Sequence, residues 1–344
     1  MISLQDVVTS VEREFLTKDF MPSNQLDGRV VFITGGAGSI GSALVLQSIA
    51  RNASKVIVLD SSEINLYHLQ QTIEEVGVAS KVAFILGDYG DDVMLKRIYA
   101  QYKVDTLIHA GAYKHVPMLQ FNVRAAVTNN VVKAVTLFKA SAKIPEWIII
   151  STDKACNPSN SMGYSKLIVE HMATFFSGGD ARIVRFGNVL GSSGSVVPLF
   201  YKQVVEGKGI TLTHAKMKRY FMSVEQATDL VLNTLSLPAG KYVLDMGEQV
   251  LISKLAEYMI KLMGKEVPIV EVGIRSGEKL EEELYLAQHE ETSEVGIMEV
   301  CGEDNGIHLH PSQFANLNTS TSEVIYLENY MQQNFNQGEH LWEL

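Results

Sequence analysis

Cysteine is scarce in this sequence. The 344 residues include two cysteines, Cys156 and Cys301, which form no CxxC pattern. Such scattered cysteines fit a reducing compartment and offer no thiol-based metal site, although two can still form one disulfide. We therefore expect a cytoplasmic protein without a metal centre.

Long apolar runs and an excess of basic residues are also missing. No stretch approaches the ~20 apolar residues of a membrane span, and the first residues lack the basic start and apolar middle of a signal peptide. The net charge of −10 argues against nucleic acid as the main partner. The composition, 46% hydrophobic and 20% charged, instead predicts a globular protein with a sizeable core.

The first strong motif is a glycine-rich turn between a strand and a helix. The apolar run 30–33 predicts a buried strand, and an apolar helical pattern follows residue 41. Gly35 permits the tight turn, Gly38 lets the backbone approach a pyrophosphate, and Gly41 lets helix and strand pack closely. Free N–H groups at the helix start favour phosphate. The residues predicted to bind the cofactor here are Gly35, Gly38, Ser39, Ile40 and Gly41.

An acidic residue ends the second predicted strand, 56–60. Asp60 stands where a carboxylate binds a ribose 2′-hydroxyl, and it would repel a 2′-phosphate. We therefore expect NAD as the cofactor. The small hydroxyl residue Ser61 tolerates a phosphate, so NADP stays open.

Two further strands, 82–86 and 106–109, continue the pattern. Strands that alternate with segments of helical length predict an α/β fold, a Rossmann-type doubly wound parallel sheet. Small residues after the fourth strand would let the backbone run against the cofactor, and a buried asparagine in the next helix needs partners. The predicted cofactor-binding residues here are Asp88, Tyr89, Ala110, Gly111, Ala112 and Asn130; Lys114 and His115 are predicted to line the substrate site.

A polar stretch after the run 147–150 is the candidate catalytic motif. Asp153 and Lys154 follow a predicted buried strand, where open α/β sheets bind ligands. On the helix that follows, Met162 and Lys166 are four residues apart and share a face. A plain strand-end turn is the alternative, but the nucleotide site upstream favours catalysis.

These motifs carry a resemblance to a known family. TGGAGSIG at 34–41, HAGAYKHVP at 109–117, STDKACNP at 151–158 and the helix with Lys166 resemble the extended short-chain dehydrogenase/reductase family. The similarity is most specific to nucleotide-sugar 4,6-dehydratases that act on UDP-N-acetylglucosamine in bacterial polysaccharide biosynthesis. It extends over about residues 28–290.

The resemblance implies a reaction. NAD takes a hydride from C4 of the sugar, Lys154 removes the C5 proton, Asp153 protonates the departing 6-hydroxyl, and the hydride returns to C6. Thr152 would hydrogen-bond the 4-oxygen, and Lys166 would hold the nicotinamide ribose. To act as a base, Lys154 must be neutral. Burial beside the positive charges of NAD⁺ and Lys166 would lower its pKa and favour the neutral form. Retention or inversion at C5 stays open.

One catalytic position departs from the wider family. Met162 stands where that family has a tyrosine, and a thioether cannot accept the C4 proton. Tyr164 lies ~200° around the helix axis from Lys166, so we predict a packing role for it. Thr152, Lys166, Asp153 and a bound water remain open as acceptors of the C4 proton.

Later residues complete the predicted substrate site. A neutral amide can bind sugar or diphosphate oxygens, and arginine forks suit a diphosphate. Glu278 could serve the nucleotide or start a helix through Leu280 and Leu284. The predicted residues are Asn188, Arg219, Arg275 and Glu278.

The expected organisation has three parts. Residues 1–27 form an N-terminal helical extension, 28–187 the NAD-binding Rossmann domain, and 188–344 mainly a smaller, discontinuous substrate-binding region, with segments such as 242–245 returning to the sheet. We expect a homo-oligomer paired through 117–140 and 162–176. The apolar side chains offered for pairing are Phe138, Leu167, Val169 and Met172.

Two other functions stay open. A UDP-hexose 4-epimerase would share the fold and Lys166 without needing Asp153 and Lys154. A non-enzymatic NAD-binding sensor would lose the catalytic groups, which this chain keeps.

Overall fold

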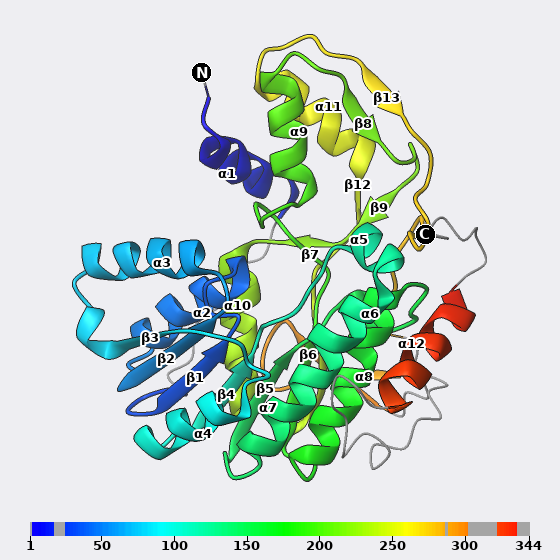
Figure 1. Cartoon of the computed structure of the whole chain (residues 1–344). Helices are drawn as coiled ribbons and strands as arrows, with labels where there is room; N and C mark the ends of the chain where they lie inside the picture. Colours follow the sequence, from blue (N-terminus) through cyan, green and yellow to red (C-terminus); the bar gives the residue numbers. More distant parts are fainter. Residues whose placement is uncertain (1, 17–24, 286–287, 302–321, 336–344) are drawn as a thin grey trace.

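The computed structural model describes residues 2–16, 25–285, 288–301 and 322–335. Within these ranges, a nine-stranded sheet runs in the order β14-β15-β11-β6-β5-β4-β1-β2-β3 (Figure 1). Its strands are β1 (Val30–Thr34), β2 (Lys55–Asp60), β3 (Val82–Leu86), β4 (Thr106–His109), β5 (Glu146–Ile150), β6 (Ala181–Arg185), β11 (Gly240–Leu244), β14 (His289–Glu291) and β15 (Ile297–Val300).

The sheet is parallel from β3 to β11, and only its far edge is antiparallel. β1 pairs in parallel with β2 and β4, and β11 pairs in parallel with β6. β15 runs antiparallel to β11, and β14 runs antiparallel to β15. The central order is that of a Rossmann sheet, so the predicted fold class is confirmed. The antiparallel edge was not predicted.

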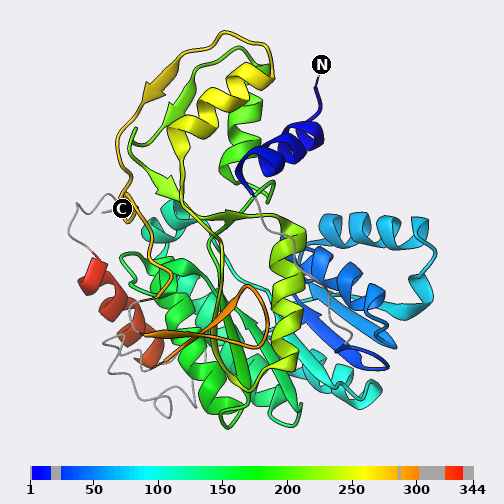
Figure 2. The same ribbon diagram turned by 180° about the vertical axis from the view of Figure 1, so that it is seen from behind.

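Alternating strand residues build a core on each face. Phe32 and Ile149 belong to one apolar cluster, whereas Ile33 and Ile148 belong to the other, because successive side chains point to opposite faces. Helices α2 (Ser39–Ala50), α3 (Glu63–Glu75) and α10 (Val224–Asn233) cover one face. Helices α4 (Asp92–Gln101), α7 (Lys133–Ser141) and α8 (Ser161–Phe176) cover the other (Figure 2).

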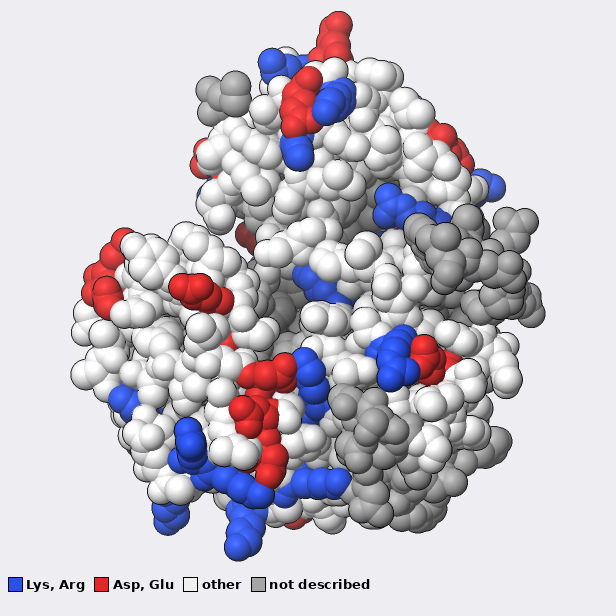
Figure 3. Space-filling model, in the orientation of Figure 1, with Lys and Arg blue, Asp and Glu red and all other residues white. Residues whose placement is uncertain are grey.

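A second lobe stands over the carboxyl ends of the strands. It contains α1 (Leu4–Phe15), α9 (Val196–Val205), α11 (Ile252–Leu262) and the short strands β8 (Ile210–Leu212), β9 (Lys218–Arg219), β12 (Val250–Leu251) and β13 (Ile269–Glu271). Its own core joins side chains such as Val11, Phe200 and Met259. The predicted N-terminal helix therefore packs on this lobe, and Figure 3 shows a hollow between the two lobes.

Short elements connect the lobes. Strand β7 (Asn188–Val189) pairs with β10 (Phe221–Met222). After β4 come α5 (Val116–Phe121), α6 (Val123–Ala126) and the π-helical turn η2 (Val127–Val132); the 3₁₀ turns are η1 (Ala79–Lys81), η3 (Asp153–Ala155) and η4 (Thr234–Ser236). None of the helices in the described ranges combines the length and apolar character needed to cross a membrane.

The last helix covers the surface predicted to pair two subunits. α12 (Ser322–Phe335) packs against α6, η2 and α8 (Figure 1). Its Val324, Leu327 and Met331 are fully buried. The predicted pairing side chains are buried in the core of the same chain, so their assignment to a subunit interface is wrong; they are Phe138, Leu167, Val169 and Met172. Self-association itself stays a prediction.

Candidate active site

The glycine turn is closed by two contacts that exclude any side chain. Gly35 has a φ of 65°, and a Cβ there would lie 2.5 Å from the Cα of Gly111. A Cβ on Gly41 would lie 2.1 Å from the carbonyl oxygen of Gly35. Gly38 is the N-cap of α2 and leaves its first N–H groups uncovered by a side chain. The tight turn and close helix packing that the sequence predicted are confirmed.

The carboxylate of Asp60 is fixed at the end of β2. It accepts hydrogen bonds from the N–H of Ala37 at 3.0 Å and from the N–H of Ser62 at 2.9 Å. The first bond ties the carboxylate to the glycine turn, and the exposed Ser61 lies beside it. The contact of Asp60 with a ribose hydroxyl stays a prediction.

Asp88 and Tyr89 follow β3 and are held by η2 and α7. Asp88 forms an ion pair with Lys133. The Tyr89 hydroxyl donates to the carbonyl of Asn129 at 2.6 Å, and burial raises its pKa. The Tyr89 ring would lie 2.9 Å from a Cβ on Gly111, so it supports the loop after β4.

Asn130 clamps the loop that leads from β4 to α5. Its Oδ1 accepts from the N–H of Tyr113 at 2.8 Å, and its Nδ2 donates to the Tyr113 carbonyl at 3.0 Å and to Ser165 at 2.9 Å. The amide therefore has the partners that burial requires. It lies in a π-helical turn, a feature frequent at functional sites. Its direct contact with a cofactor stays a prediction.

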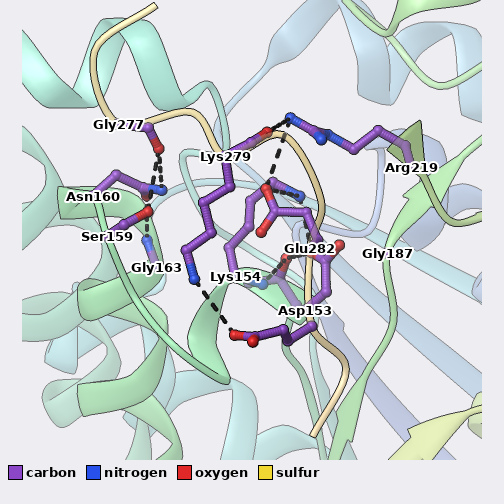
Figure 4. A network of polar contacts seen from close by, with 12 residues as sticks. Asp153, Lys154, Ser159, Asn160, Gly163, Gly187, Arg219, Gly277, Lys279 and Glu282 are labelled. Atoms are coloured by element: carbon purple, nitrogen blue, oxygen red, sulfur yellow. Dashed lines mark hydrogen bonds and ion pairs between the residues drawn. The ribbon is translucent and has the colours of Figure 1, made fainter. Parts of the chain in front are cut away.

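The candidate catalytic pair lies in η3, directly beyond β5. Lys154 Nζ donates to Asp153 Oδ1 at 2.9 Å (Figure 4). The Thr152 hydroxyl donates to the same oxygen at 2.8 Å. Asp153 is 1% exposed, and its Oδ2 is buried with no hydrogen-bond partner among the residues that the structure describes. The Asp153 N–H donates to the carbonyl of Phe186, which anchors the turn to the end of β6. One carboxyl oxygen is thus committed and the other is available.

Helix α8 packs its first turn onto η3. A Cβ on Gly163 would lie 2.3 Å from the Lys154 carbonyl oxygen, so only glycine fits there. One turn later, the amine of Lys166 is buried and makes no hydrogen bond to another described residue. Burial lowers the pKa of Lys166 to about 8, and the nearby Glu170 opposes this. A buried amine without a protein partner suits a bound ligand.

Two other residues of α8, Met162 and Tyr164, contribute to the same apolar core. Met162 is 4% exposed and belongs to the core beneath the sheet. Tyr164 packs partly buried against that core, and burial together with neighbouring Tyr330 raises its pKa. Because Tyr330 lies on α12, Tyr164 faces that helix.

A buried ion pair beneath η3 was missed by sequence reasoning. The Arg185 guanidinium binds the Glu170 carboxylate through two hydrogen bonds, at 2.8 and 2.7 Å, and Ser151 donates to it at 2.5 Å. Burial pushes the pKa of Glu170 up, but Arg185 and Lys241 lower it more. The pair joins α8 to β6 just below the catalytic turn.

A segment of the second lobe docks onto the catalytic turn. Lys279 Nζ donates to the Asn157 carbonyl at 2.7 Å. Asn160 Nδ2 donates to the Gly277 carbonyl at 3.0 Å (Figure 4). The helix predicted through Leu280 and Leu284 is absent, since this segment is irregular over residues 272–285. Polar groups of this stretch bind the facing loop, as Lys279 and the Gly277 carbonyl do.

The two predicted diphosphate arginines have different surroundings. Arg219 is 7% exposed and donates to the carbonyls of Lys218, Lys279 and Leu280. These contacts give no support to a direct diphosphate contact. Arg275 is half-exposed, with Nη1 3.9 Å from Glu278 Oε1, so its guanidinium remains accessible.

Glu282 is the site residue that the sequence did not reveal. Its side chain is 6% exposed, and its Oε1 lies 4.0 Å from Lys154 Nζ. Burial raises its pKa. It sits within a run of three glutamates, 281–283, that is also typical of a solvated surface, so no pattern distinguished it.

The remaining predicted residues lie around the gap between the lobes. Lys114 and His115 are exposed, and His115 lies against the loop that contains Gly194, because a Cβ on Gly194 would lie 2.4 Å from His115 Cε1. In the loop that contains Gly194, the N–H of Ser193 donates a hydrogen bond to the Ser39 hydroxyl. The structure gathers the predicted cofactor residues at the carboxyl ends of β1, β2, β3 and β4 and in α2 and η2: Gly35, Gly38, Ser39, Ile40, Gly41, Asp60, Ser61, Asp88, Tyr89, Ala110, Gly111, Ala112 and Asn130.

A glycine turn at the switch point of a parallel sheet, with an acid at the end of β2 and a lysine helix beside β5, defines a Rossmann-type protein of the extended short-chain dehydrogenase/reductase class. The comparison with protein families gives the same class. Residues 31–301 match the family described as Polysaccharide biosynthesis protein, and the chain belongs to that family.

Characterised relatives differ in their names. The chain is 37% identical over 275 residues to the capsular polysaccharide biosynthesis protein CapD of Staphylococcus aureus, covering 76% of this chain and 46% of CapD. EpsC of Bacillus subtilis is 38% identical, with the same shares. The chain thus spans about half the length of these two relatives. A UDP-glucose 4-epimerase of Rickettsia typhi is 33% identical, covering 76% of this chain and 78% of the epimerase.

Solved structures agree on the fold. Pen from Bacillus thuringiensis superposes with a TM-score of 0.73 at 29% identity, covering 80% of this chain and 88% of Pen. DesIV, a dTDP-glucose 4,6-dehydratase from Streptomyces venezuelae, superposes with a TM-score of 0.65 at 23% identity, covering 74% of this chain and 88% of DesIV.

Proposed function

We propose that this protein is a nucleotide-sugar 4,6-dehydratase that converts UDP-N-acetylglucosamine to a UDP-4-keto-6-deoxy-N-acetylhexosamine in polysaccharide biosynthesis. One observation carries the proposal: a hydrogen-bonded acid and amine, Asp153 and Lys154, lie at the end of β5, next to the helix that carries the buried amine of Lys166. Elimination of water needs a base at C5 and an acid at the 6-hydroxyl together, whereas C4 epimerisation needs an acceptor only for the C4 hydroxyl proton.

The residues around the glycine turn fit NAD. The N-cap Gly38 makes no side-chain hydrogen bond to the first turn of α2, where a pyrophosphate would bind, and the fixed Asp60 carboxylate would bind a ribose hydroxyl. Lys166 would hold the nicotinamide ribose. When bound, NAD would accept the C4 hydride and return it to C6. DesIV, which has this fold, was solved with NAD bound.

The protein groups supply the proton transfers. The resting pair shares one proton between Lys154 Nζ and Asp153 Oδ1 across 2.9 Å. Transfer of that proton to Asp153 leaves a neutral amine to remove the C5 proton and a carboxylic acid to protonate the departing 6-hydroxyl. Thr152, bound to the same carboxylate, would contact the 4-oxygen.

Turnover of UDP-N-acetylglucosamine followed by NMR tests the function. We expect a 6-methyl signal that appears with loss of the C6 hydroxymethyl protons. Absence of that signal from a protein that holds NAD would contradict the proposal. No turnover at all would support a non-enzymatic NAD-binding sensor.

A UDP-hexose 4-epimerase is the second candidate, favoured by the epimerase name of the Rickettsia relative. In the same NMR experiment it would give a galacto-configured product and no 6-methyl signal. The buried Asp153–Lys154 pair has no task in that reaction, which is why the dehydratase is preferred.

The cofactor preference has its own test. Denaturing the purified protein should release NAD(H), because a 2′-phosphate would meet the carboxylate of Asp60. Release of mainly NADP(H) would contradict this assignment.

A further inference from the structure

Glu282 is a buried carboxylate for which the proposed chemistry has no role. Its Oε1 lies 4.0 Å from Lys154 Nζ and 3.9 Å from Arg219 Nη2. Figure 4 shows it on the second-lobe segment, directed toward the Asp153–Lys154 pair. A buried carboxylate beside a candidate catalytic amine marks a functional position.

The backbone that carries Glu282 is held from both lobes. Arg219 donates to the carbonyls of Lys279 at 2.8 Å and Leu280 at 3.1 Å. Gln249 donates to the carbonyl of Glu282 itself at 3.0 Å, and Lys279 reaches across to the Asn157 carbonyl. Three anchored points within four residues fix where the carboxyl lies, so its approach to Lys154 is built into the fold.

Four charged groups surround this carboxyl. Burial raises the pKa of Glu282; Lys154, Arg219 and Lys279 oppose that shift, and Asp153 adds to it. Arg219 stays charged at any working pH, and Lys279 is committed to the carbonyl of Asn157. Lys154 is therefore the neighbouring cation that loses a proton in the proposed reaction, and Glu282 affects how readily it does so.

We propose that Glu282 is a positioning residue that acts through Lys154, as the second carboxyl that faces this amine and sets how readily the amine loses its proton. A carboxylate within about 4–6 Å favours the ammonium form, whereas a neutral amide does not. The catalytic consequence rests on the proposed function; the electrostatic coupling between Glu282 and Lys154 does not.

Competitive acetylation of lysines tests the coupling without turnover. Acetic anhydride modifies only neutral amines, so labelling against pH, read by peptide mass spectrometry, gives a midpoint for each lysine. Glu282→Gln should move the Lys154 midpoint about one pH unit lower. The matched control is Glu281→Gln, since Glu281 is 56% exposed and pairs with Lys218 at 2.8 Å. It should leave Lys154 unchanged.

Two outcomes overturn the proposal. One is a Glu282→Gln protein with a native circular dichroism spectrum and an unmoved Lys154 midpoint. The other is a Glu281→Gln protein in which the Lys154 midpoint moves equally, because the effect would then be a general charge effect.

The pH profile of kcat gives a second readout. In Glu282→Gln its acidic limb should move to lower pH, and Glu282→Asp should bring it back toward the wild-type position. A uniform loss of rate with an unmoved limb would mean a structural role and overturn the proposal. If the wild-type protein forms no 6-deoxy product, the proposed function fails, and acetylation still decides the claim about Glu282.

Discussion

At the scale of single residues, the buried amine of Lys166 makes stability depend on pH. Its pKa is about 8 in the folded chain, against an ordinary 10.5. Between these values the unfolded chain binds more protons, so the free energy of unfolding rises with pH. Below about 8 both states are protonated, and the cost of burying the ammonium is fully present.

The test compares the wild-type protein with Lys166→Met. We expect the stability of the wild-type protein relative to this variant to rise by about 2 kcal/mol between pH 7 and pH 9.5. Urea unfolding at the two pH values measures the difference. A difference that does not change with pH would mean that the amine is not desolvated.

Lys154 and Tyr164 give contrasting predictions for activity. Lys154→Ala should abolish the 6-deoxy product while NAD stays bound, because no other described amine contacts Asp153. Tyr164→Phe should keep activity within about twofold, since Tyr164 lies beside Tyr330 and away from the Lys166 face. NMR turnover assays and released cofactor measure both. A folded Tyr164→Phe protein that binds NAD but cannot oxidise C4 would overturn this view of the site.

The two arginines also separate by experiment. Arg275→Ala should weaken UDP binding about 10–100-fold, the loss expected when a charged hydrogen bond is removed. Arg219→Ala should instead lower the melting temperature, because it removes three hydrogen bonds to backbone carbonyls. Calorimetric titration with UDP and thermal unfolding measure the two effects. Equal UDP affinity in Arg275→Ala and the wild-type protein would remove Arg275 from the substrate site.

At the scale of elements, the ion pair between α8 and β6 holds the catalytic turn. Glu170→Ala would remove the carboxylate that binds the buried Arg185 guanidinium through two hydrogen bonds, so we expect a loss of about 3–5 kcal/mol. The exposed pair of Asp92 with Lys96 is the control, and Asp92→Asn should cost under about 1 kcal/mol. Urea unfolding compares them, and similar losses would contradict the assignment.

The same pair predicts acid sensitivity. The folded-state pKa of Glu170 is lowered despite the opposing effect of burial, chiefly by Arg185. Its stabilisation is therefore present above the ordinary carboxyl pKa and is lost as pH falls through the lowered value. In Glu170→Gln the loss of stability between neutral and acidic pH should be smaller than in the wild-type protein, by urea unfolding.

Elements with a local signal were predictable from the sequence, and contacts between distant segments were not. β1 and β5 are continuous apolar runs, and the glycine turn has fixed spacing. The central sheet and the end of it that carries the predicted cofactor residues could therefore be predicted from the sequence. Glu282 could not be distinguished because its burial depends on Arg219 holding carbonyls about 60 residues away in the chain. The same applies to Glu170, whose partner lies on another element.

At the scale of the whole molecule, α12 takes the place that a partner subunit was predicted to fill. It packs on α6, η2 and α8 through fully buried side chains, whereas Ile325 on the same helix is 52% exposed. Apolar burial of this kind stabilises by about 25 cal/mol per Å². Removing α12 from its site would expose the apolar side chains beneath it, and such patches associate.

A charge placed under α12 tests this arrangement. Leu327→Glu buries an unpaired carboxylate against α8, so the helix should detach, and the protein should sediment as larger species than the wild-type protein at equal concentration. Ile325→Glu changes the same helix by the same charge on its exposed face and should sediment as the wild-type protein does. Analytical ultracentrifugation with circular dichroism separates association from unfolding. If both variants behave alike, α12 does not shield this surface, and pairing through 117–140 and 162–176 becomes the better account of the molecule.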